Sequence, residues 1–436
     1  MGTALFGATS KHLLRAAYAA AAIVSAASLC GPGAVTAAAQ TPGGSNGGGV
    51  VSVAAYGADP TGSRDSTQAF AQAVASGNSV YVPPGNYIIS DYDKIVLNRP
   101  MQALIGAGAR ASILDYTGPC DADVIATDSV VRLAQPEEVV RDLGITSHRA
   151  QKCIVIGIQM ISNHGLVDNV AVSQMWHRGI AVHGNYNSVL NSDIEYNRVG
   201  IFLGGSHQLA RGNYISNHWS ESPAPRLWTN QSAYWDGIMA EGLTDSVIDG
   251  NTVEDNGQSG IYTGGNHSVS NGNIISYNVV RHNRNEGIDQ GVLGVPNPSS
   301  NYVGHLIIVG NTTEDNFRRD IWLNQVDGAV VVNNHAAYTG DATRWWAHDI
   351  RTPDDESLPC AVWETTAASK SDNVIFENNV CDQEDPQFPA LVFNPGRGRN
   401  NVLGDNLVHG ERRVSPNVDR STNVIFPPRS QSETPQ

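Results

Sequence analysis

Carboxylate side chains recur beside a repeated Gly-Ile phrase in the middle of the chain. The phrase occurs at Gly179-Ile180, Gly200-Ile201, Gly237-Ile238, Gly260-Ile261 and Gly287-Ile288, and Asp320-Ile321 takes a sixth place. Four acids stand next to two of these phrases: Asp236, Glu241, Glu286 and Asp289. Two carboxyl groups held close together, one protonated and one ionised, can act as a general acid and a base. These four acids are therefore the candidate catalytic residues.

Aromatic and basic residues occupy matching positions around the same phrases. If a strand follows each glycine, the Ile faces inward, and the first and third residues after it face outward. Glycine at the third position, as at Gly204, Gly264 and Gly291, leaves room for a ligand. Flat rings beside carboxylates suit sugars. The candidate substrate-binding residues are Phe202, Tyr262, Trp322, Trp235, His183 and Arg178.

The spacing of the Gly-Ile phrases indicates stacked coils. Units of about 21 to 27 residues with several short strands and polar turns are typical of a parallel β-helix. A second marker, an Asn after a short β-branched run, occurs at Asn169, Asn213, Asn251, Asn278, Asn311, Asn334, Asn379 and Asn406, with Asp193 substituting once. Coils about 4.8 Å apart would stack these amides on one another. We expect this Asn column to be structural, like the alternating charges of Glu254, Arg281 and Glu314.

The segment before the repeat resembles that of a known superfamily. Residues 53–70 read VAAYGADPTGSRDSTQAF, and residues 80–87 read VYVPPGNY. Both are similar to the opening segment of right-handed parallel β-helix proteins of the pectate-lyase type. The resemblance covers about residues 50–410 and implies an all-β, single-stranded right-handed parallel β-helix with carbohydrate as its ligand. The superfamily hosts several chemistries, so the resemblance does not select one.

The two ends of the chain differ from the repeat. An Ala-rich apolar run after two basic residues predicts a secretory signal peptide. A helix that begins at Asp65 and buries Phe70 and Val74 is expected to cap the first coil. The predicted organisation is a signal peptide at 1–39, a flexible lead-in at 40–49, the β-helix domain at 50–410 and a polar tail at 411–436. We therefore expect a secreted or periplasmic protein.

Charge and cysteine content limit the partners and the compartment. The chain has 27 Lys+Arg against 42 Asp+Glu, a formal charge of −15. Such a surface repels nucleic acid and anionic lipid, so neither nucleic acid nor membrane is an expected partner. The four cysteines after the signal allow three disulfide pairings in an oxidising compartment. We expect pairing of near neighbours, Cys120 with Cys153 and Cys360 with Cys381.

Three functions are compatible with these residues. The favoured one is hydrolysis of a glycosidic bond in a polysaccharide or oligosaccharide by two of the four acids, which requires no cofactor or metal. The alternative is β-elimination or C5-epimerisation of a uronic-acid polymer, with calcium as a cofactor. Its acid or base would be His183, His282, Tyr262 or Arg178, but an acidic protein attracts a polyanion poorly. The third is glycan binding without catalysis.

Overall fold

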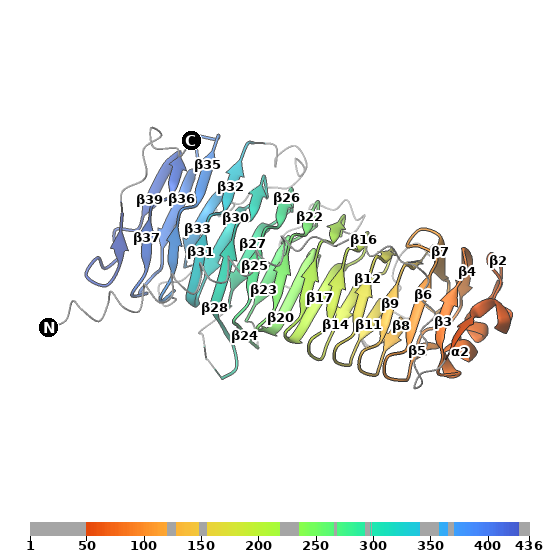
Figure 1. Cartoon of the computed structure of the whole chain (residues 1–436). Coiled ribbons are helices and arrows are strands. Elements are labelled where there is room, and N and C mark those ends of the chain that lie inside the picture. Colours follow the sequence, from red (N-terminus) through yellow and green to blue (C-terminus); the bar gives the residue numbers. More distant parts are fainter. Residues whose placement is uncertain are drawn as a thin grey trace, which may run out of the picture. The chain divides into compact units, whose positions relative to one another are not determined.

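The computed structural model describes residues 49–119, 128–147, 155–218, 235–265, 268–292, 297, 299–340, 357–364 and 370–426. They belong to a unit that begins at Gly48. Short parallel strands dominate this unit, and successive coils lie side by side in chain order from the red strands to the blue ones (Figure 1). The all-β parallel β-helix expected from the sequence is confirmed.

The strands form three parallel ladders, which we call A, B and C. The A ladder contains the Gly-Ile phrases. Its strands are β5 (Ile95–Leu97), β8 (Ser129–Leu133), β11 (Ile156–Met160), β14 (Arg178–Val182), β17 (Val199–Ser206), β20 (Ile238–Thr244), β23 (Ile261–Gly264), β27 (Glu286–Gly291), β30 (Arg319–Asn324), β33 (Leu358–Trp363), β36 (Pro389–Asn394) and β39 (Glu411–Val414).

The B and C ladders form the other two sides of the coils. The B strands are β1 (Val50–Ser52), β3 (Ser79–Val82), β6 (Ala103–Gly106), β9 (Val139–Arg141), β12 (Leu166–Asp168), β15 (Ser188–Leu190), β18 (Leu209–Arg211), β21 (Val247–Asp249), β25 (Ile274–Ser276), β28 (Tyr302–Val309), β31 (Val326–Val332), β34 (Ile375–Glu377), β37 (Val402–Gly404) and β40 (Val424–Ile425), with β24 (Val269–Asn271) beside β28. The C strands are β2 (Thr61–Asp65), β4 (Gly85–Ile89), β7 (Ser112–Tyr116), β10 (Gly144–Thr146), β13 (Ala171–Ser173), β16 (Asp193–Glu195), β19 (Tyr214–Ser216), β22 (Thr252–Glu254), β26 (Val279–Arg281), β29 (Thr312–Glu314), β32 (His335–Tyr338), β35 (Val380–Gln383) and β38 (Leu407–His409).

The coils extend beyond the C-terminal boundary expected from the sequence. β39 pairs with β36, and β40 pairs with β37. Glu411–Val414 and Val424–Ile425, which we assigned to a polar tail, therefore add to the ladders, because strand pairing satisfies their backbone whatever their side chains are. The predicted signal peptide at 1–39 and most of the lead-in at 40–49 lie outside the described residues.

The expected helix is α2 (Thr67–Ala75), the one α-helix among the described residues. Phe70, Ala73 and Val74 are buried in the main core. Ser66, not Asp65, stands at the N-cap position, while Asp65 accepts a hydrogen bond from the Thr67 N–H at 3.0 Å. A short 3-10 helix, η1 (Val53–Tyr56), contacts α2. The role of α2 as a cap stays a prediction.

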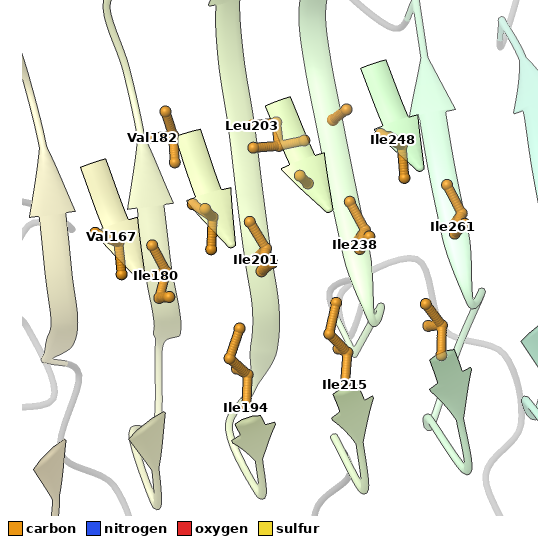
Figure 2. Close-up of a cluster of buried hydrophobic side chains, with 14 of the residues drawn as sticks. Val167, Ile180, Val182, Ile194, Ile201, Leu203, Ile215, Ile238, Ile248 and Ile261 are labelled. Carbon is orange, nitrogen blue, oxygen red and sulfur yellow. The ribbon is translucent and has the colours of Figure 1, made fainter. Parts of the chain in front are cut away.

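The core is the interior of the coils, lined by isoleucine, valine and leucine from all three ladders. Figure 2 shows the isoleucines of the Gly-Ile phrases in one row, facing residues such as Ile194 and Ile248 from the C and B ladders. The predicted stacking is confirmed by the register, which aligns Ile180 with Ile201 and Ile238 with Ile261. Each coil therefore buries its apolar side chains against its neighbours.

The Asn column forms a hydrogen-bonded ladder at the corner between B and C. The N–H and the side-chain amide of Asn251 both donate to Asn278 Oδ1, at 2.9 Å each, and the same pattern repeats from Asn278 to Asn311. Two expected members are wrong. Asn169 is exposed on a corner, and Ser192, not Asp193, precedes Asn213 in the ladder.

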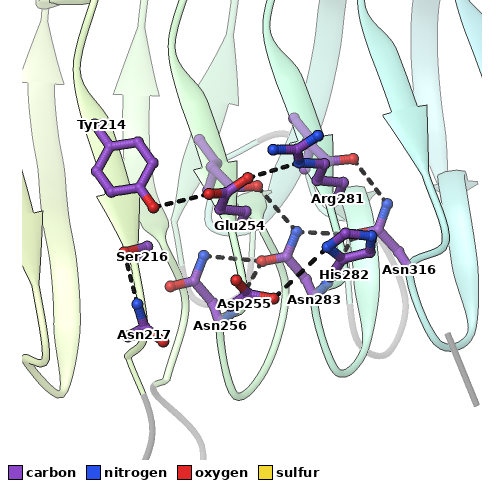
Figure 3. A network of polar contacts seen from close by, with 12 residues as sticks. Tyr214, Ser216, Asn217, Glu254, Asp255, Asn256, Arg281, His282, Asn283 and Asn316 are labelled. Atoms are coloured by element: carbon purple, nitrogen blue, oxygen red, sulfur yellow. Dashed lines mark hydrogen bonds and ion pairs between the residues drawn. The ribbon is translucent and has the colours of Figure 1, made fainter. Parts of the chain in front are cut away.

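Two further predicted contacts are confirmed. Arg281 Nε donates to Glu254 Oε2 at 2.6 Å across adjacent C strands (Figure 3). Cys360 and Cys381 form a disulfide between β33 and β35. The second expected pair, Cys120 with Cys153, lies outside the described residues.

Candidate active site

Both residues of each Gly-Ile phrase face the interior. The residues just before and just after the phrase therefore form two columns on the outer side of the A ladder. A Cβ on Gly237 would collide with the interior Val253 and come within 2.8 Å of Asn256 Nδ2, so both Gly237 and Ile238 face the interior. Two consecutive inward positions place the residue before the glycine and the residue after the isoleucine on the same outer side. We call these the pre-Gly and post-Ile positions.

The two columns contain the convergent acids, Ser259 and most of their neighbours. Pre-Gly positions hold Arg178, Val199, Asp236, Ser259, Glu286 and Arg319, and post-Ile positions hold Ala181, Phe202, Met239, Tyr262, Asp289 and Trp322. Val199, Phe202 and Met239 form an apolar cluster separate from the interior core, with Tyr262 packed against it. This separation confirms that both columns face outward.

Asp236 and Asp289 converge on Ser259 from opposite sides. The Ser259 N–H donates to Asp236 Oδ1 at 2.9 Å, and Ser259 Oγ lies 3.4 Å from Asp289 Oδ2. The N and Oγ of one serine are at most about 3.7 Å apart. The nearest oxygens of the two carboxyl groups are therefore at most about 10 Å apart, by the geometry of that bridge.

Glu286 is paired with arginines at the start of the next coil, and its charge also acts on Asp236 and Asp289. Its Oε1 accepts a hydrogen bond from Arg319 at 3.0 Å, and Arg318 lies at 3.7 Å. Its other oxygen, Oε2, is buried without a hydrogen-bond partner. The Arg319 guanidinium lies 4.5 Å from the ring centroid of Trp322 and 4.9 Å from that of Trp363. Glu286 is therefore the ionic neighbour of the pair rather than a member of it.

The site is more buried than the sequence suggested. The exposed fractions of Asp236, Ser259, Glu286, Asp289 and Arg319 are 2, 1, 0, 8 and 3%. The room expected at Gly264 is also taken, because the hydroxyl end of the Tyr262 ring lies where a Cβ would be. The expectation of open carboxylates along a cleared groove is therefore wrong, since outward side chains of neighbouring coils pack on one another.

Burial and charge together favour protons on the two convergent acids. The pKa of Asp236 is raised from 3.8 to about 8, chiefly by burial and also by the charges of Glu286 and Glu241, while the hydrogen bond from the Ser259 N–H opposes the rise. Burial also raises the pKa of Asp289 well above its usual range, with repulsion from Glu286 and Asp236. Arg319 and Ser259 act in the opposite direction on Asp289. Asp289 is thus the one of the two with a cation that favours its ionised form.

Three predicted binding residues gather one to two coils before the coil that carries Asp236. The Arg178 guanidinium lies 3.9 Å from the centroid of the Phe202 ring, and the His183 ring centroid lies 5.3 Å from that of Phe202. Burial lowers the pKa of His183, and the charge of Arg178 lowers it further. Phe202 is itself buried, so this group does not present the open sugar-stacking face expected of it.

Other predicted residues lie nearer the pair but have different surroundings. Glu241 is partly buried on β20, opposite Gly264. Trp322 Nε1 donates to the Trp363 carbonyl at 3.1 Å. Trp235 packs edge-on against Trp176 at 6.2 Å between centroids. The other rings of its insertion, in residues 219–234, lie outside the described residues.

His282 is not on the A side. It lies at the corner that follows the C ladder, where its Nδ1 is 3.7 Å from Asp255 Oδ1 (Figure 3). The charged neighbours drawn around it come from the C strands. His282 follows β26 beside Asp255 and is not among the charges that act on Asp236 or Asp289, so it is not a neighbour of the convergent acids.

Sequence reasoning did not select Ser259 and Arg319 as site residues. Both stand in the pre-Gly column, so the alignment of the repeats already contained the signal that could have found them. Trp363 was not selected because it lies on β33, beyond the last Gly-Ile phrase. In the part of the chain that the structure describes, no three His, Cys, Asp or Glu side chains are arranged to hold a metal ion, and no helix could span a membrane.

Comparison with known proteins identifies the fold. A family model described as right handed beta helix region matches residues 139–293. The chain is a right-handed parallel β-helix protein. This β-helix protein is 35% identical over 307 residues to the tail spike protein of Salmonella phage epsilon15. The matched region covers 63% of this chain and 28% of the tail spike protein. The chain thus spans less than a third of the curated relative that it matches.

Solved structures resemble the β-helix protein at lower identity. The Dettilon tailspike protein shares 22% identity and a TM-score of 0.71 over 84% of this chain and 68% of its own. DFA-IIIase from Arthrobacter chlorophenolicus A6, solved without its lid in complex with GF2, shares 13% and 0.64 over 88% and 100%. The A-module of the mannuronan C-5 epimerase AlgE4 from Azotobacter vinelandii shares 15% and 0.58 over 86% and 100%. At these identities the likeness shows the fold.

Proposed function

We propose that this β-helix protein is an exported enzyme that hydrolyses glycosidic bonds in a polysaccharide or oligosaccharide. The observation that carries the proposal is the convergence of Asp236 and Asp289 on Ser259. Hydrolysis requires two carboxyl groups with different protonation states. Tyr262 and Trp322 flank the pair in the post-Ile column and offer aromatic surface for a sugar ring.

The pKa values of both carboxyl groups are raised, and we assign the two roles from the one cation, Arg319, that acts on Asp289 and not on Asp236. Asp236 has carboxylates but no cation among the charges that act on it, so it keeps its proton and serves as the general acid. It donates that proton to the glycosidic oxygen as the bond to the anomeric carbon breaks. Asp289, which Arg319 favours in its ionised form, accepts a proton from the attacking water or attacks the anomeric carbon itself.

The separation of the two carboxyl groups leaves both stereochemical outcomes open. The upper limit of about 10 Å includes the ~5 Å of retaining enzymes and the ~6.5–9.5 Å of inverting ones. Because the acids are buried in this structure, a sugar must displace side chains that cover them. Closing a site against water is also what keeps the acid protonated near neutral pH.

The test is a panel of neutral and uronic polysaccharides incubated with the purified protein. Two signals are followed, new reducing ends and the ultraviolet absorbance of unsaturated uronates. New reducing ends without absorbance support hydrolysis. Absorbance together with reducing ends indicates β-elimination and contradicts the proposal. Binding without either signal contradicts it as well and leaves epimerisation or glycan binding as the function.

The pH profile of kcat/KM separates the two carboxyl groups. We expect an alkaline limb near pH 8, because Asp236 loses its proton there, and an acidic limb well above the ordinary carboxyl value of 3.8, because Asp289 must ionise. Glu241→Gln removes a negative charge that raises the pKa of Asp236 but is not among the charges acting on Asp289.

In Glu241→Gln the alkaline limb should therefore move to lower pH while the acidic limb stays in place. Turnover at the optimum should remain within about tenfold of the wild type, because Glu241 is not part of the pair. Rates measured from pH 4 to 10 in one buffer series give both limbs. An unmoved alkaline limb would contradict the assignment of Asp236 as the acid.

A further inference from the structure

Two polar side chains lie in the inward row of the A ladder directly beneath the candidate site. They are Thr263 on β23 and Gln290 on β27, and both are fully buried. The same inward position holds an apolar residue in the neighbouring coils of the A ladder: Met160, Val182, Leu203, Ala240, Leu323, Val362 and Phe393. Burying polar groups costs free energy unless they find partners, so this pair calls for an explanation beyond packing.

The two side chains bond to each other and to the main chain of the site. Thr263 Oγ1 donates to Gln290 Oε1. Gln290 Nε2 donates to the carbonyl oxygen of Asp289 at 2.7 Å. The Gln290 amide oxygen thus accepts a hydrogen bond from the coil that carries Ser259, and the amide nitrogen donates one to the backbone of Asp289.

The pair sits where the backbone ladder between these coils is interrupted. β23 and β27 pair at Ile261↔Ile288 and Tyr262↔Asp289, and the next backbone bond between these coils is the one from Gly265 N–H to Gly291 O at 3.1 Å. On either side the ladder continues further, to Glu241↔Gly264 and to Gly291↔Asn324. Continuing the register would place Thr263 opposite Gln290. In the gap between the Tyr262↔Asp289 pair and the Gly265–Gly291 backbone bond, the Thr263–Gln290 side-chain bond links the two coils.

We infer that Thr263 and Gln290 are positioning residues that hold Asp289 at its distance from Ser259. The inference rests on the proposed function for its kinetic consequence. The Thr263–Gln290 bond ties the two coils together behind the interruption, and the Gln290 amide fixes the peptide plane of Asp289. Because the Asp289 side chain leaves that backbone on the opposite, outer side, a shift of the peptide changes its approach to Ser259 and Asp236.

Thr263→Val tests the inference, since valine keeps the shape of threonine and removes the hydroxyl donor. Thr313→Val is the matched control: Thr313 is a buried threonine on β29 whose hydroxyl has no hydrogen-bond partner. Gln290→Met is a second variant that removes the amide. The readouts are kcat, KM, the thermal midpoint and a crystal structure of each variant.

Thr263→Val and Gln290→Met should lower kcat about tenfold to a hundredfold, the scale of a misplaced catalytic group, with KM within about twofold. In their crystals the Ser259 Oγ to Asp289 Oδ2 distance should differ from the present 3.4 Å. Thr313→Val should change neither quantity. A falling thermal midpoint without these changes would mark a purely structural role and overturn the inference.

The crystal structures also separate this inference from the proposed function. If the wild type cleaves no glycan but Asp289 moves in Thr263→Val, hydrolysis is refuted and the positioning role stands. If the wild type is a hydrolase and Thr263→Val matches Thr313→Val in kcat and in the Asp289 position, the positioning role is refuted and hydrolysis stands.

Discussion

Replacing Asp236 or Asp289 by asparagine should lower turnover at least about a hundredfold, the scale of general acid–base catalysis. Asparagine has nearly the shape of the acid but can neither donate the carboxyl proton nor carry the negative charge. The measurement is kcat on the substrate found in the polysaccharide panel. Near-normal turnover in both variants would exclude the carboxylate mechanism.

Asp249→Asn is the matched control for these variants. Asp249 is also buried on an outer side of the coils, where it accepts hydrogen bonds from Arg211 and Ser276 at 2.8 and 2.7 Å. It lies on β21, away from the Gly-Ile face. Its variant should keep normal turnover per folded molecule, although the loss of its ion pair lowers stability.

Stability measurements distinguish lost chemistry from lost folding. The pKa of Asp236 is raised from 3.8 to about 8 in the folded protein. Its favourable contribution to folding is fully present below pH 3.8 and is lost as the pH rises through about 8. Asp236→Asn removes this dependence, so between neutral and alkaline pH the variant should be at least as stable as the wild type while turnover is lost.

A second large effect is expected from the Asn ladder. Asn278→Ala removes the acceptor of two donors of Asn251 and the donor to Ile248 O and Asn311 Oδ1. Each buried polar group left without a partner costs about 1–3 kcal/mol, so the free energy of unfolding should fall by about 3 kcal/mol or more. Urea unfolding followed by circular dichroism measures the change.

Asn98→Ala is the comparison for the ladder variant, because Asn98 is exposed on the surface. Its free energy of unfolding should stay within about 0.5 kcal/mol of the wild type. Equal losses in the two variants would show that the amide ladder contributes no more than an ordinary surface asparagine.

The repeat made most of the fold predictable. In stacked coils each unit contacts its neighbours, so a residue that recurs at one position in the sequence recurs at one place in space. This is why the Ile rows, the Glu254–Arg281 contact and most of the Asn column follow from aligned repeats. The two errors in the Asn column come from a shift of one residue. Asn169 and Asp193 lie next to the inward corner position, which Val170 and Ser192 occupy.

The polar C-terminal strands show where periodicity stops being informative. β39 has no inward row of isoleucines, and Arg412 stands opposite Leu391. Backbone hydrogen bonds hold such a strand in the ladder whatever its side chains are. Hydropathy therefore ended the domain at residue 410, whereas strand pairing continues to Ile425.

By itself the sequence determined the parallel coils and the face on which Asp236 and Asp289 lie, while it left three disulfide pairings open, of which the structure shows Cys360 with Cys381. Only the tertiary structure decided which acids converge, because that depends on how each side chain leans toward a neighbouring coil. Arg319 donates a hydrogen bond to Glu286, and Ser259 lies between the other two acids. Spacing along the chain specifies position to within one coil. The direction of a side chain is set by charge and hydrogen-bond partners that come from coils tens of residues away.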